Sequence, residues 1–303
     1  MNLGQLMQKY ADIHHLNDLE GAVQTELAGV WFYRSSYGNA RQPFTYQSGV
    51  VILGQGHKNI YIGNESVTYG PNDYLVVGVP MPLECEAIPA KGKPLLGLSV
   101  DIDSQLLHNQ VNTLESMGFK TQRSLVDSAR GLTSVTMQSS MIDVCKRLMI
   151  ALCDPVELAI LGHSLKEEMT YRVLTSRKGH VLFDLAHHEG NYARVAKALS
   201  KVHQNYHEHL SVEKLAEEAS MSVSAFHNAF RKVTLESPIQ YIKKVRLNKA
   251  RELIQLSGKR VNDAARLVGY NSVSQFSREY KRHFNHTPAE SVNSKFDTSS
   301  RQG

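Results

Sequence analysis

Along much of the first hundred residues, hydrophobic residues occur in short runs, and polar and turn-forming residues separate these runs. Residues 1–20 place Leu3, Leu6, Met7 and Tyr10 on one stripe, which predicts a helix. From Val30 on, β-branched and aromatic runs are broken by Gly, Pro and Asn, and such runs predict an antiparallel sandwich or barrel. The predicted strands are Val30–Ser36, Gly49–Leu53, Asn59–Ile62, Glu65–Tyr69, Tyr74–Val79, Leu83–Ile88 and Leu95–Val100.

The strand pattern stops after Asp101, and a helical period replaces it. Leu158, Leu161, Leu165 and Met169 make a stripe at steps of three and four residues. This stripe fits either simple packing on the barrel or a dimer interface, which a short heptad seam would suit. The helices predicted here are Gln105–Met117, Thr136–Leu152, Pro155–Thr175 and Leu182–His187.

The last third of the chain is predicted to be helical as far as Phe284. Ser211 and Ser222 suit N-caps, Pro238 suits a first helical turn, and Gly258 and Gly269 follow helix ends. The predicted helices are Tyr192–His207, Val212–Glu218, Ser224–Val233, Pro238–Gln255, Val261–Val268 and Ser272–Phe284.

Two segments in this region repeat one design, a short turn that opens a helix with aromatics on one face and polar residues on the other. Residues 221–232 and 268–284 carry the copies, with Ser222 and Ser272 lying 50 residues apart. In a helix-turn-helix the second helix lies in the major groove of DNA and the first helix braces it. Pro238–Gln255 would be a stiff spacer between the two copies. The sequence therefore predicts two DNA-reading heads.

The residues expected on the exposed faces form a set suited to a DNA groove. Arg pairs with guanine, Gln and Asn pair with adenine, Ser contacts bases or phosphates, and Lys neutralises phosphates. The first face carries Ser224, His227, Asn228, Arg231 and Lys232, and the second carries Ser274, Gln275, Ser277, Arg278, Lys281 and Arg282.

Charge is distributed unevenly between the two parts of the chain. Residues 195–303 hold 18 Lys and Arg against 10 Asp and Glu, a net charge of +8, whereas residues 1–194 carry −3. A basic part next to a mildly acidic one indicates that one half of the protein meets a polyanion.

Cys85, Cys145 and Cys153 show no disulfide or CxxC spacing, and no apolar run is long enough to span a bilayer. We therefore expect a cytoplasmic protein.

Residues from about 205 to 290 resemble the DNA-binding domain of the AraC/XylS family of bacterial transcription regulators. The resemblance rests on residues 264–270 through Phe284 with Thr287-Pro288, on 237–241, and on 246–251. It implies seven helices with two helix-turn-helix units. Residues 56–58, 62–63, 69–71, 80–83 and 94–96 are similar to the cupin-like sensor of one branch of that family.

Three positions depart from the family pattern. Leu235 stands where glycine is frequent, so a left-handed turn there would be strained. Asn228 stands where arginine is frequent, which would alter base preference, and Ser291 replaces an aromatic residue near the last turn.

The predicted fold class is α+β with two domains. Residues 1–190 form a cupin-like antiparallel β-barrel with helices that serves ligand binding and dimerisation. Residues 191–303 form an all-α DNA-binding domain. Arg34, His57, Tyr61 and Glu84 are the candidate residues for a small ligand in the barrel.

The expected function is sequence-specific transcription regulation under the control of a small effector. The expected partners are double-stranded DNA, the effector, RNA polymerase and a second copy of the chain, with no membrane partner. A barrel that serves only dimerisation or protein binding is one alternative, and a cupin enzyme fused to a DNA-binding domain is another. His57 has no His-x-His neighbour, and P-loop, Rossmann and Gly-x-Ser-x-Gly motifs are missing from the sequence, so neither enzyme activity nor a metal or other cofactor is expected.

Overall fold

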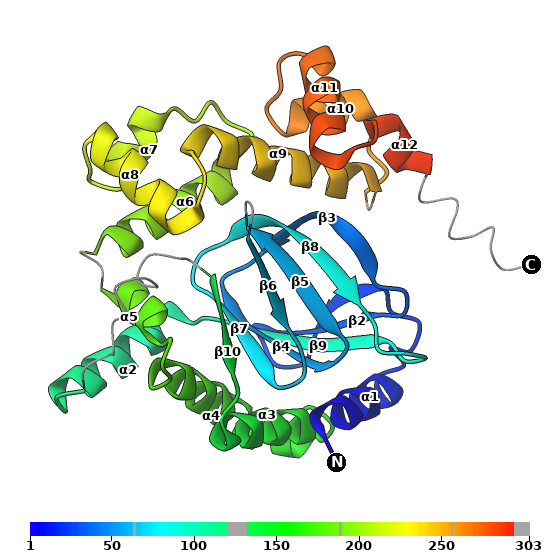
Figure 1. The fold of residues 1–303 in the computed structure, drawn as a ribbon, viewed down its shortest axis with the longest axis vertical. Coiled ribbons are helices and arrows are strands. Elements are labelled where there is room, and N and C mark those ends of the chain that lie inside the picture. Colours follow the sequence, from blue (N-terminus) through cyan, green and yellow to red (C-terminus); the bar gives the residue numbers. More distant parts are fainter. Residues whose placement is uncertain (63–64, 120–131, 188–189, 256, 294–303) are drawn as a thin grey trace, which may run out of the picture. The chain divides into compact units, whose positions relative to one another are not determined.

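The computed structural model describes residues 1–62, 65–119, 132–187, 190–255 and 257–293 (Figure 1). The chain divides into an N-terminal unit, which ends at Ala193, and a C-terminal unit, which is built mainly from Arg194 onward. The first unit combines antiparallel strands with helices, and the second is helical. The predicted two-domain α+β class is therefore confirmed.

Two sheets make up the strand part of the N-terminal unit. Their strands are β1 (Gly21–Gln24), β2 (Val30–Ser35), β3 (Asn39–Tyr46), β4 (Gly49–Gln55), β5 (His57–Ile62), β6 (Glu65–Tyr69), β7 (Asp73–Val77), β8 (Met81–Ile88), β9 (Leu95–Asp101) and β10 (Leu132–Thr136). One sheet has the order β1-β2-β9-β4-β7-β10, and the other has the order β3-β8-β5-β6. The predicted barrel thus consists of two antiparallel sheets that keep their own edges, and not of one closed cylinder.

Each of the seven strands predicted between Val30 and Val100 is present, but β1, β3 and β10 were missed. β3 lacks the expected apolar alternation because residues 40–42 are all exposed. It lies at the edge of its sheet, where a proline such as Pro43 is tolerated. The helix predicted to begin at Thr136 was placed too early, since Thr136 pairs with Asp73 as the last residue of β10.

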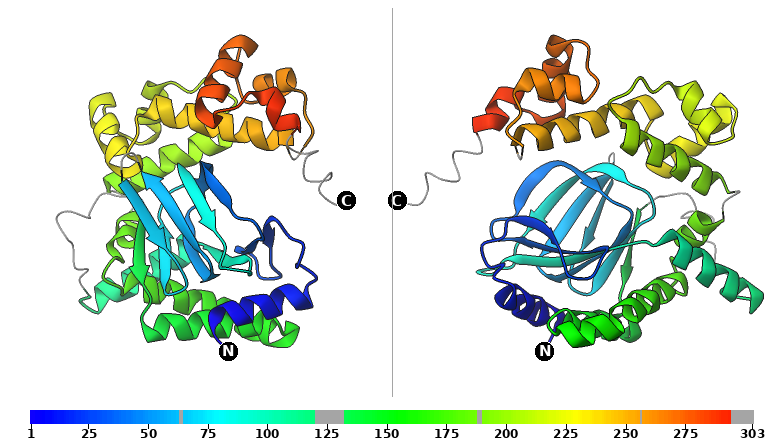
Figure 2. Two further views of the ribbon diagram at one scale, coloured as in Figure 1. Left: turned by 45° about the vertical axis from the view of Figure 1, so that its right-hand side comes forward. Right: turned by 180° about the vertical axis from the view of Figure 1, so that it is seen from behind.

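Five helices accompany the sheets in the described part of this unit. They are α1 (Leu3–Ile13), α2 (Ser104–Ser116), α3 (Ser139–Ala151), α4 (Pro155–Leu174) and α5 (His180–Ala186). Figure 2 shows α1, α3 and α4 following one another along one side of the strands. α1 approaches β4 closely, since a Cβ atom on Gly4 would lie 2.5 Å from the carbonyl oxygen of Gly54. Only glycine leaves room for this contact.

The predicted stripe on α4 is divided between the interior and the surface. Leu165 and Met169 are buried, whereas Leu161 is 42% exposed and Leu158 is half-buried. Packing within the unit therefore accounts for the second half of the stripe. Among the large hydrophobic residues of α4, Val156 and Ile160 are the most exposed.

The C-terminal unit contains seven helices within its described residues, the number implied by the family resemblance. They are α6 (Asn191–Asn205), α7 (Val212–Glu218), α8 (Val223–Thr234), α9 (Pro238–Gln255), α10 (Val261–Leu267), α11 (Val273–Phe284) and α12 (Pro288–Asn293). α12 alone was not predicted from the hydrophobic pattern. Ser291 on α12 is fully buried, and its hydroxyl lies 2.8 Å from both the Tyr280 hydroxyl and His286 Nε2. Hydrogen bonds thus replace the aromatic packing that is frequent at this position.

Candidate nucleic-acid interface

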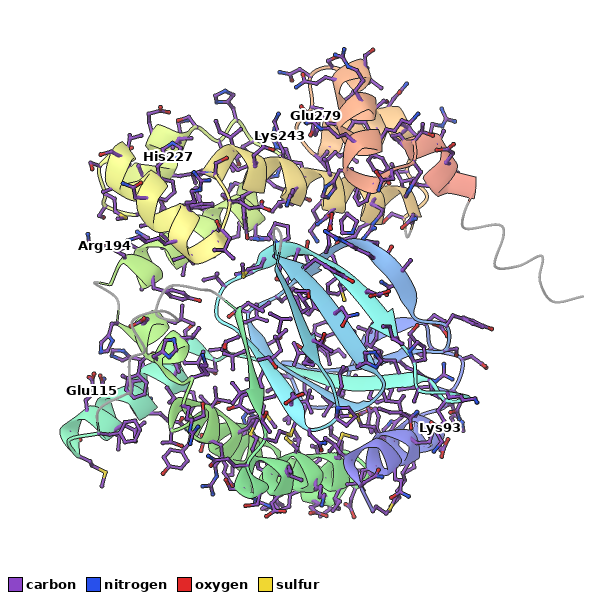
Figure 3. All side chains as sticks on the ribbon, viewed as in Figure 1. Lys93, Glu115, Arg194, His227, Lys243 and Glu279 are labelled. Carbon is purple, nitrogen blue, oxygen red and sulfur yellow. The ribbon has the colours of Figure 1, made fainter. Side chains whose placement is uncertain are left out.

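The first helix-turn-helix consists of α7 and α8. Ser222 caps α8, and its hydroxyl accepts a hydrogen bond from the backbone N–H of Ala225 at 3.3 Å. Phe226 and Phe230 are fully buried one helical turn apart, with ring centroids separated by 5.3 Å. Because these aromatics face the interior, the opposite face of α8 points to solvent. That face carries Ser224, Asn228, Arg231 and Lys232 as exposed residues and His227 as a half-buried residue. His227 is labelled on α8 in Figure 3.

The second helix-turn-helix consists of α10 and α11 and repeats this construction. Ser272 caps α11, and its hydroxyl accepts from the backbone N–H of Gln275 at 3.2 Å. Phe276 and Tyr280 are fully buried and Phe284 nearly so. The solvent face carries Ser274, Gln275, Arg278, Lys281 and Arg282 as exposed residues and Ser277 as a half-buried residue. All eleven predicted DNA-contact residues thus lie on the two faces that the buried aromatics leave open.

Both reading helices end in a left-handed residue. Leu235 has φ +64° and Asn285 has φ +63° at equivalent positions. Asparagine tolerates this conformation, but for leucine the Cβ atom comes too close to the backbone. Leu235 is therefore a strained position, as its departure from the family pattern predicted.

Leu235→Gly is expected to raise the free energy of unfolding by about 0.5–1 kcal/mol, because relief of the left-handed strain exceeds the added entropy of glycine. Urea denaturation of the full chain measures the difference. Asn285→Gly is the matched control and should shift stability by less than about 0.5 kcal/mol. A destabilised Leu235→Gly variant would show that packing of the leucine side chain outweighs its backbone strain.

α9 joins the two heads by contributing to the core of each. The Tyr241 ring packs edge-on against the Phe230 ring of the first head, with 5.4 Å between the ring centroids. Leu247, Ala250 and Ile254 belong to the buried cluster that contains Phe276 of the second head. With 18 residues and a rise of ~1.5 Å per residue, α9 spans ~27 Å and acts as the predicted stiff spacer.

Arg246 on α9 joins the segment that precedes the first head to the turn of the second head. Its guanidinium donates to the carbonyl oxygens of Tyr206 and Glu208 at 2.7 Å and of Gly269 at 3.3 Å. Gly269 has φ +86°, and a Cβ atom there would lie 2.5 Å from the carbonyl oxygen of His207. The turn of the second head is thereby held against the chain that leads into the first head. Sequence reasoning gave Arg246 no role, because all its acceptors are backbone carbonyls.

Glu279 is a second residue with a role that the sequence did not show. It lies on α11, and its side chain is only 11% exposed. Lys243 on α9 points toward it, with 3.0 Å between Nζ and Oε1 (Figure 3). The Tyr270 hydroxyl and the Gln275 side chain also donate to this carboxylate. Hydrogen bonds from Tyr270, Lys243 and Gln275 outweigh the desolvation that opposes them and lower the pKa of Glu279.

Two half-buried histidines lie in the C-terminal unit. His203 Nε2 is 2.8 Å from the Tyr241 hydroxyl, and His283 Nε2 is 3.2 Å from Asn248 Oδ1. Burial lowers the pKa of His203 to about 4 and that of His283 to about 3. Both rings are therefore neutral near pH 7.

The residues predicted to bind an effector are not gathered in one place within the N-terminal unit. Arg34 on β2 is 8% exposed, and its Nη1 donates to the Leu19 carbonyl at 3.1 Å and to the Ser36 hydroxyl at 2.8 Å. Phe32, two residues away on the same face, packs against Tyr10 of α1. Arg34 thus lies on the α1 side of its sheet.

Tyr61 and Glu84 are register partners on β5 and β8. Arg41 joins them, since its Nε lies 2.5 Å from Glu84 Oε2 and its guanidinium lies 4.1 Å from the Tyr61 ring centre. His57 begins β5 and is exposed. Lys58, the next residue, is 5% exposed and lies 4.0 Å from the Tyr33 ring, and burial lowers its pKa. A buried lysine between the sheets was not predicted.

Cavities open on the described part of the N-terminal unit, and two of them are large enough for a small molecule. One, of about 450 Å³, is polar, lies beside β10 and the ends of α3 and α4, and includes Arg172, Arg177 and Lys178 in its lining. The other, of about 680 Å³, lies between α2 and α4 and includes Met117, Phe119 and Tyr171. Among the described residues, no three His, Cys, Asp or Glu side chains are grouped to hold a metal ion. None of the described helices combines the length and the apolarity that a membrane crossing requires.

Two stiffly joined helix-turn-helix units that follow a two-sheet domain in the chain are typical of one class of transcription regulator. The family model for the AraC-type transcriptional regulator N-terminus matches residues 26–181, and a helix-turn-helix domain model matches residues 215–293. The first match covers more than half of the chain. The protein belongs to the AraC/XylS family of transcriptional regulators.

Curated relatives resemble the chain over about a third of its length. The transcriptional regulator AlkR of Acinetobacter baylyi is 32% identical over 97 residues, which is 32% of each chain. The transcriptional activator RhaS of an Enterobacter species is 29% identical over 102 residues, 34% of this chain and 37% of RhaS. The chain thus matches about a third of the length of these relatives.

Solved structures share the fold over most of the chain. Apo ToxT of Vibrio cholerae, in a variant form, superposes with a TM-score of 0.56 at 13% identity, covering 89% of this chain and 98% of ToxT. ToxT in complex with a small acid superposes with a TM-score of 0.53 at 11% identity, covering 86% and 96%. These likenesses concern the fold alone.

Proposed function

We propose that the protein is a sequence-specific DNA-binding transcription regulator in the bacterial cytoplasm. The observation that carries this proposal is the pair of equivalent reading helices, α8 and α11, whose polar faces are open while their aromatic faces are buried. α9 holds the two at a set separation, and successive major grooves on one side of DNA lie ~34 Å apart. A modest bend of the DNA would let both heads bind.

Selection from random double-stranded DNA, with the full chain as bait, tests this proposal. We expect one enriched motif, read in two parts, whose affinity falls steeply with salt because lysines and arginines displace counterions. Enrichment without a motif at every salt concentration would contradict sequence-specific regulation.

Arg278→Ala is expected to weaken binding to the selected site by ~1–3 kcal/mol and to relax the preference at one base, since arginine reads guanine edges. Lys281→Ala should weaken all sequences about equally and reduce the salt slope by about one. Competition binding over a set of single-base variants separates the two effects. Lys201→Ala on α6 removes an exposed charge away from both reading faces and is the control. Equal behaviour of Arg278→Ala and Lys281→Ala would contradict these roles.

We further propose that a small effector binds the N-terminal unit and shifts the population of DNA-binding states. A ToxT structure with this fold holds (E)-4-(8-methylnaphthalen-1-yl)but-3-enoic acid. Tyr61 and Glu84, with Arg41 between them, are the proposed contact site, and Arg34 and His57 are proposed as contacts at separate positions. A thermal-shift screen that includes small carboxylic acids tests effector binding, because a ligand of the folded state raises its stability. Tyr61→Phe then tests the site around Arg41, and Arg34→Ala tests the separate position on β2.

Two other partners belong to this proposal. A second copy of the chain would bind through the outer face of α4, where Val156 and Ile160 are each almost three-quarters exposed. Ile160→Lys, compared with wild type by sedimentation, should then yield monomers.

RNA polymerase is the expected partner during transcription. If no ligand stabilises the protein but Ile160→Lys abolishes regulation, the N-terminal unit serves dimerisation alone. Metal analysis of the purified chain tests the cupin-enzyme alternative.

A further inference from the structure

Gln275 is held at both ends on the exposed face of α11. Its backbone N–H donates to the Ser272 hydroxyl at 3.2 Å. Its side-chain Nε2 donates to Glu279 Oε1 at 3.3 Å, one helical turn further on. The side chain remains exposed, so its amide faces solvent in one orientation. A groove-facing amide is thereby oriented before any DNA arrives.

Glu279 is itself anchored from outside α11. Lys243 Nζ on α9 lies 3.0 Å from Oε1, and the Tyr270 hydroxyl in the preceding turn lies 2.7 Å from Oε2. Tyr270 is 7% exposed, and its ring packs against the buried Phe276 at 5.3 Å. The carboxylate is therefore a well-placed acceptor whose position depends on the core of the second head.

The chemistry of the two groups determines which way the amide turns. An ionised carboxylate accepts hydrogen bonds but donates none, so the nitrogen of the Gln275 amide faces Glu279. One N–H and the carbonyl oxygen remain for the groove. That donor and acceptor match adenine, which offers the N7 acceptor and the N6 donor, whereas guanine offers two acceptors, N7 and O6. An untethered amide has two N–H donors and could turn both toward guanine.

The first head lacks this arrangement. At the positions 50 residues earlier stand Ala225 and Ala229, although the N-cap serines and the buried aromatics are the same in design. A tethered glutamine is thus a property of the second head alone. The comparison also shows that this helix position accepts alanine without loss of the fold.

We propose that Glu279 is a positioning residue that makes Gln275 select adenine over guanine at one base of the site read by α11. This inference rests on the proposed DNA-binding function. Glu279 acts through Gln275 and does not itself need to touch DNA. Its loss should therefore change the choice at one base and leave the rest of the motif as it was.

The test compares dissociation constants of the full chain for its selected site and for the same site with adenine replaced by guanine. Wild type should prefer adenine by roughly tenfold, within the range of one bidentate contact. Glu279→Gln should reduce that ratio to about threefold or less, because the amide it introduces both donates and accepts and so frees Gln275 to turn. Glu252→Gln removes an exposed carboxylate on α9 and should leave the ratio unchanged.

A double-variant comparison separates positioning from a general effect on the fold. In a Gln275→Ala background, Glu279→Gln should no longer alter the adenine-to-guanine ratio. If thermal melting shows that Glu279→Gln is unfolded, Glu279→Ala replaces it in both backgrounds, with Ala229 as the structural precedent. An unchanged ratio in the Glu279 variant, or the same change in the Gln275→Ala background, would overturn the inference. If wild type selects no sequence, the proposed function fails and this inference with it.

Discussion

Phe276→Ala should lower the free energy of unfolding of the C-terminal unit by about 3–5 kcal/mol, the usual loss for a phenylalanine removed from a core. Phe276 is fully buried, and its ring packs against those of Tyr270 and Tyr280. A domain of this size has a stability of only about 5–15 kcal/mol, so the variant should bind DNA poorly even at room temperature. Denaturation in urea, followed by far-UV circular dichroism, measures the loss.

Leu267→Ala is the matched control for this substitution. Leu267 lies on α10 in the same head, but it is 49% exposed, so the loss should stay near or below 1 kcal/mol. A Phe276→Ala variant as stable as Leu267→Ala would show that the second head does not depend on its aromatic core.

Acidification should destabilise the C-terminal unit well before its carboxylates titrate. The pKa of His203 is lowered to about 4 and that of His283 to about 3, from 6.5 in the unfolded chain. Between pH 6.5 and 4.5 the unfolded state therefore binds more protons than the folded state, and stability falls as the pH falls. Each ring should contribute roughly 2–3 kcal/mol over this window, at about 1.4 kcal/mol per pH unit.

Unfolding free energies of the full chain at several pH values between 4.5 and 7 test this expectation. His283→Gln keeps a polar side chain beside Asn248 but does not titrate, so its curve should be flatter than that of wild type. His207→Gln changes an exposed histidine and should leave the slope unchanged. A wild-type stability that is constant across the window would mean that the rings of His203 and His283 are solvated in the folded state.

The C-terminal helices could be predicted from the sequence because one local, amphipathic pattern occurs twice, once in each head. Ser222 and Ser272 begin helices as N-caps, and Phe226 and Phe276 recur at the same place after them. Such signals act within a few residues of each other. The eleven predicted contact residues follow from this pattern, and their contacts with DNA remain a prediction.

Long-range contacts could not be predicted in the same way. Arg246 reaches backbone carbonyls up to 40 residues away, and Glu279 meets Lys243 across 36 residues. A single sequence does not reveal such pairs, because nothing local distinguishes them from solvated charges. Lys58 was missed as well. The alternation of side chains along β5 places it between the sheets, but lysine is seldom buried, so its burial was not expected. β3 was missed because it is an edge strand whose exposed polar residues do not alternate with buried apolar ones.

The sharing of α9 bears on where the C-terminal unit can be cut. A fragment that ended after α9 would keep one head but expose Leu247, Ala250 and Ile254 to water, and a fragment that began with α10 would lose the same three residues from its core. Single-head truncations of this protein should therefore aggregate or remain unfolded. Reprogramming one half of its binding site calls for substitutions on an intact pair of heads, and not for exchange of a single head as a cassette.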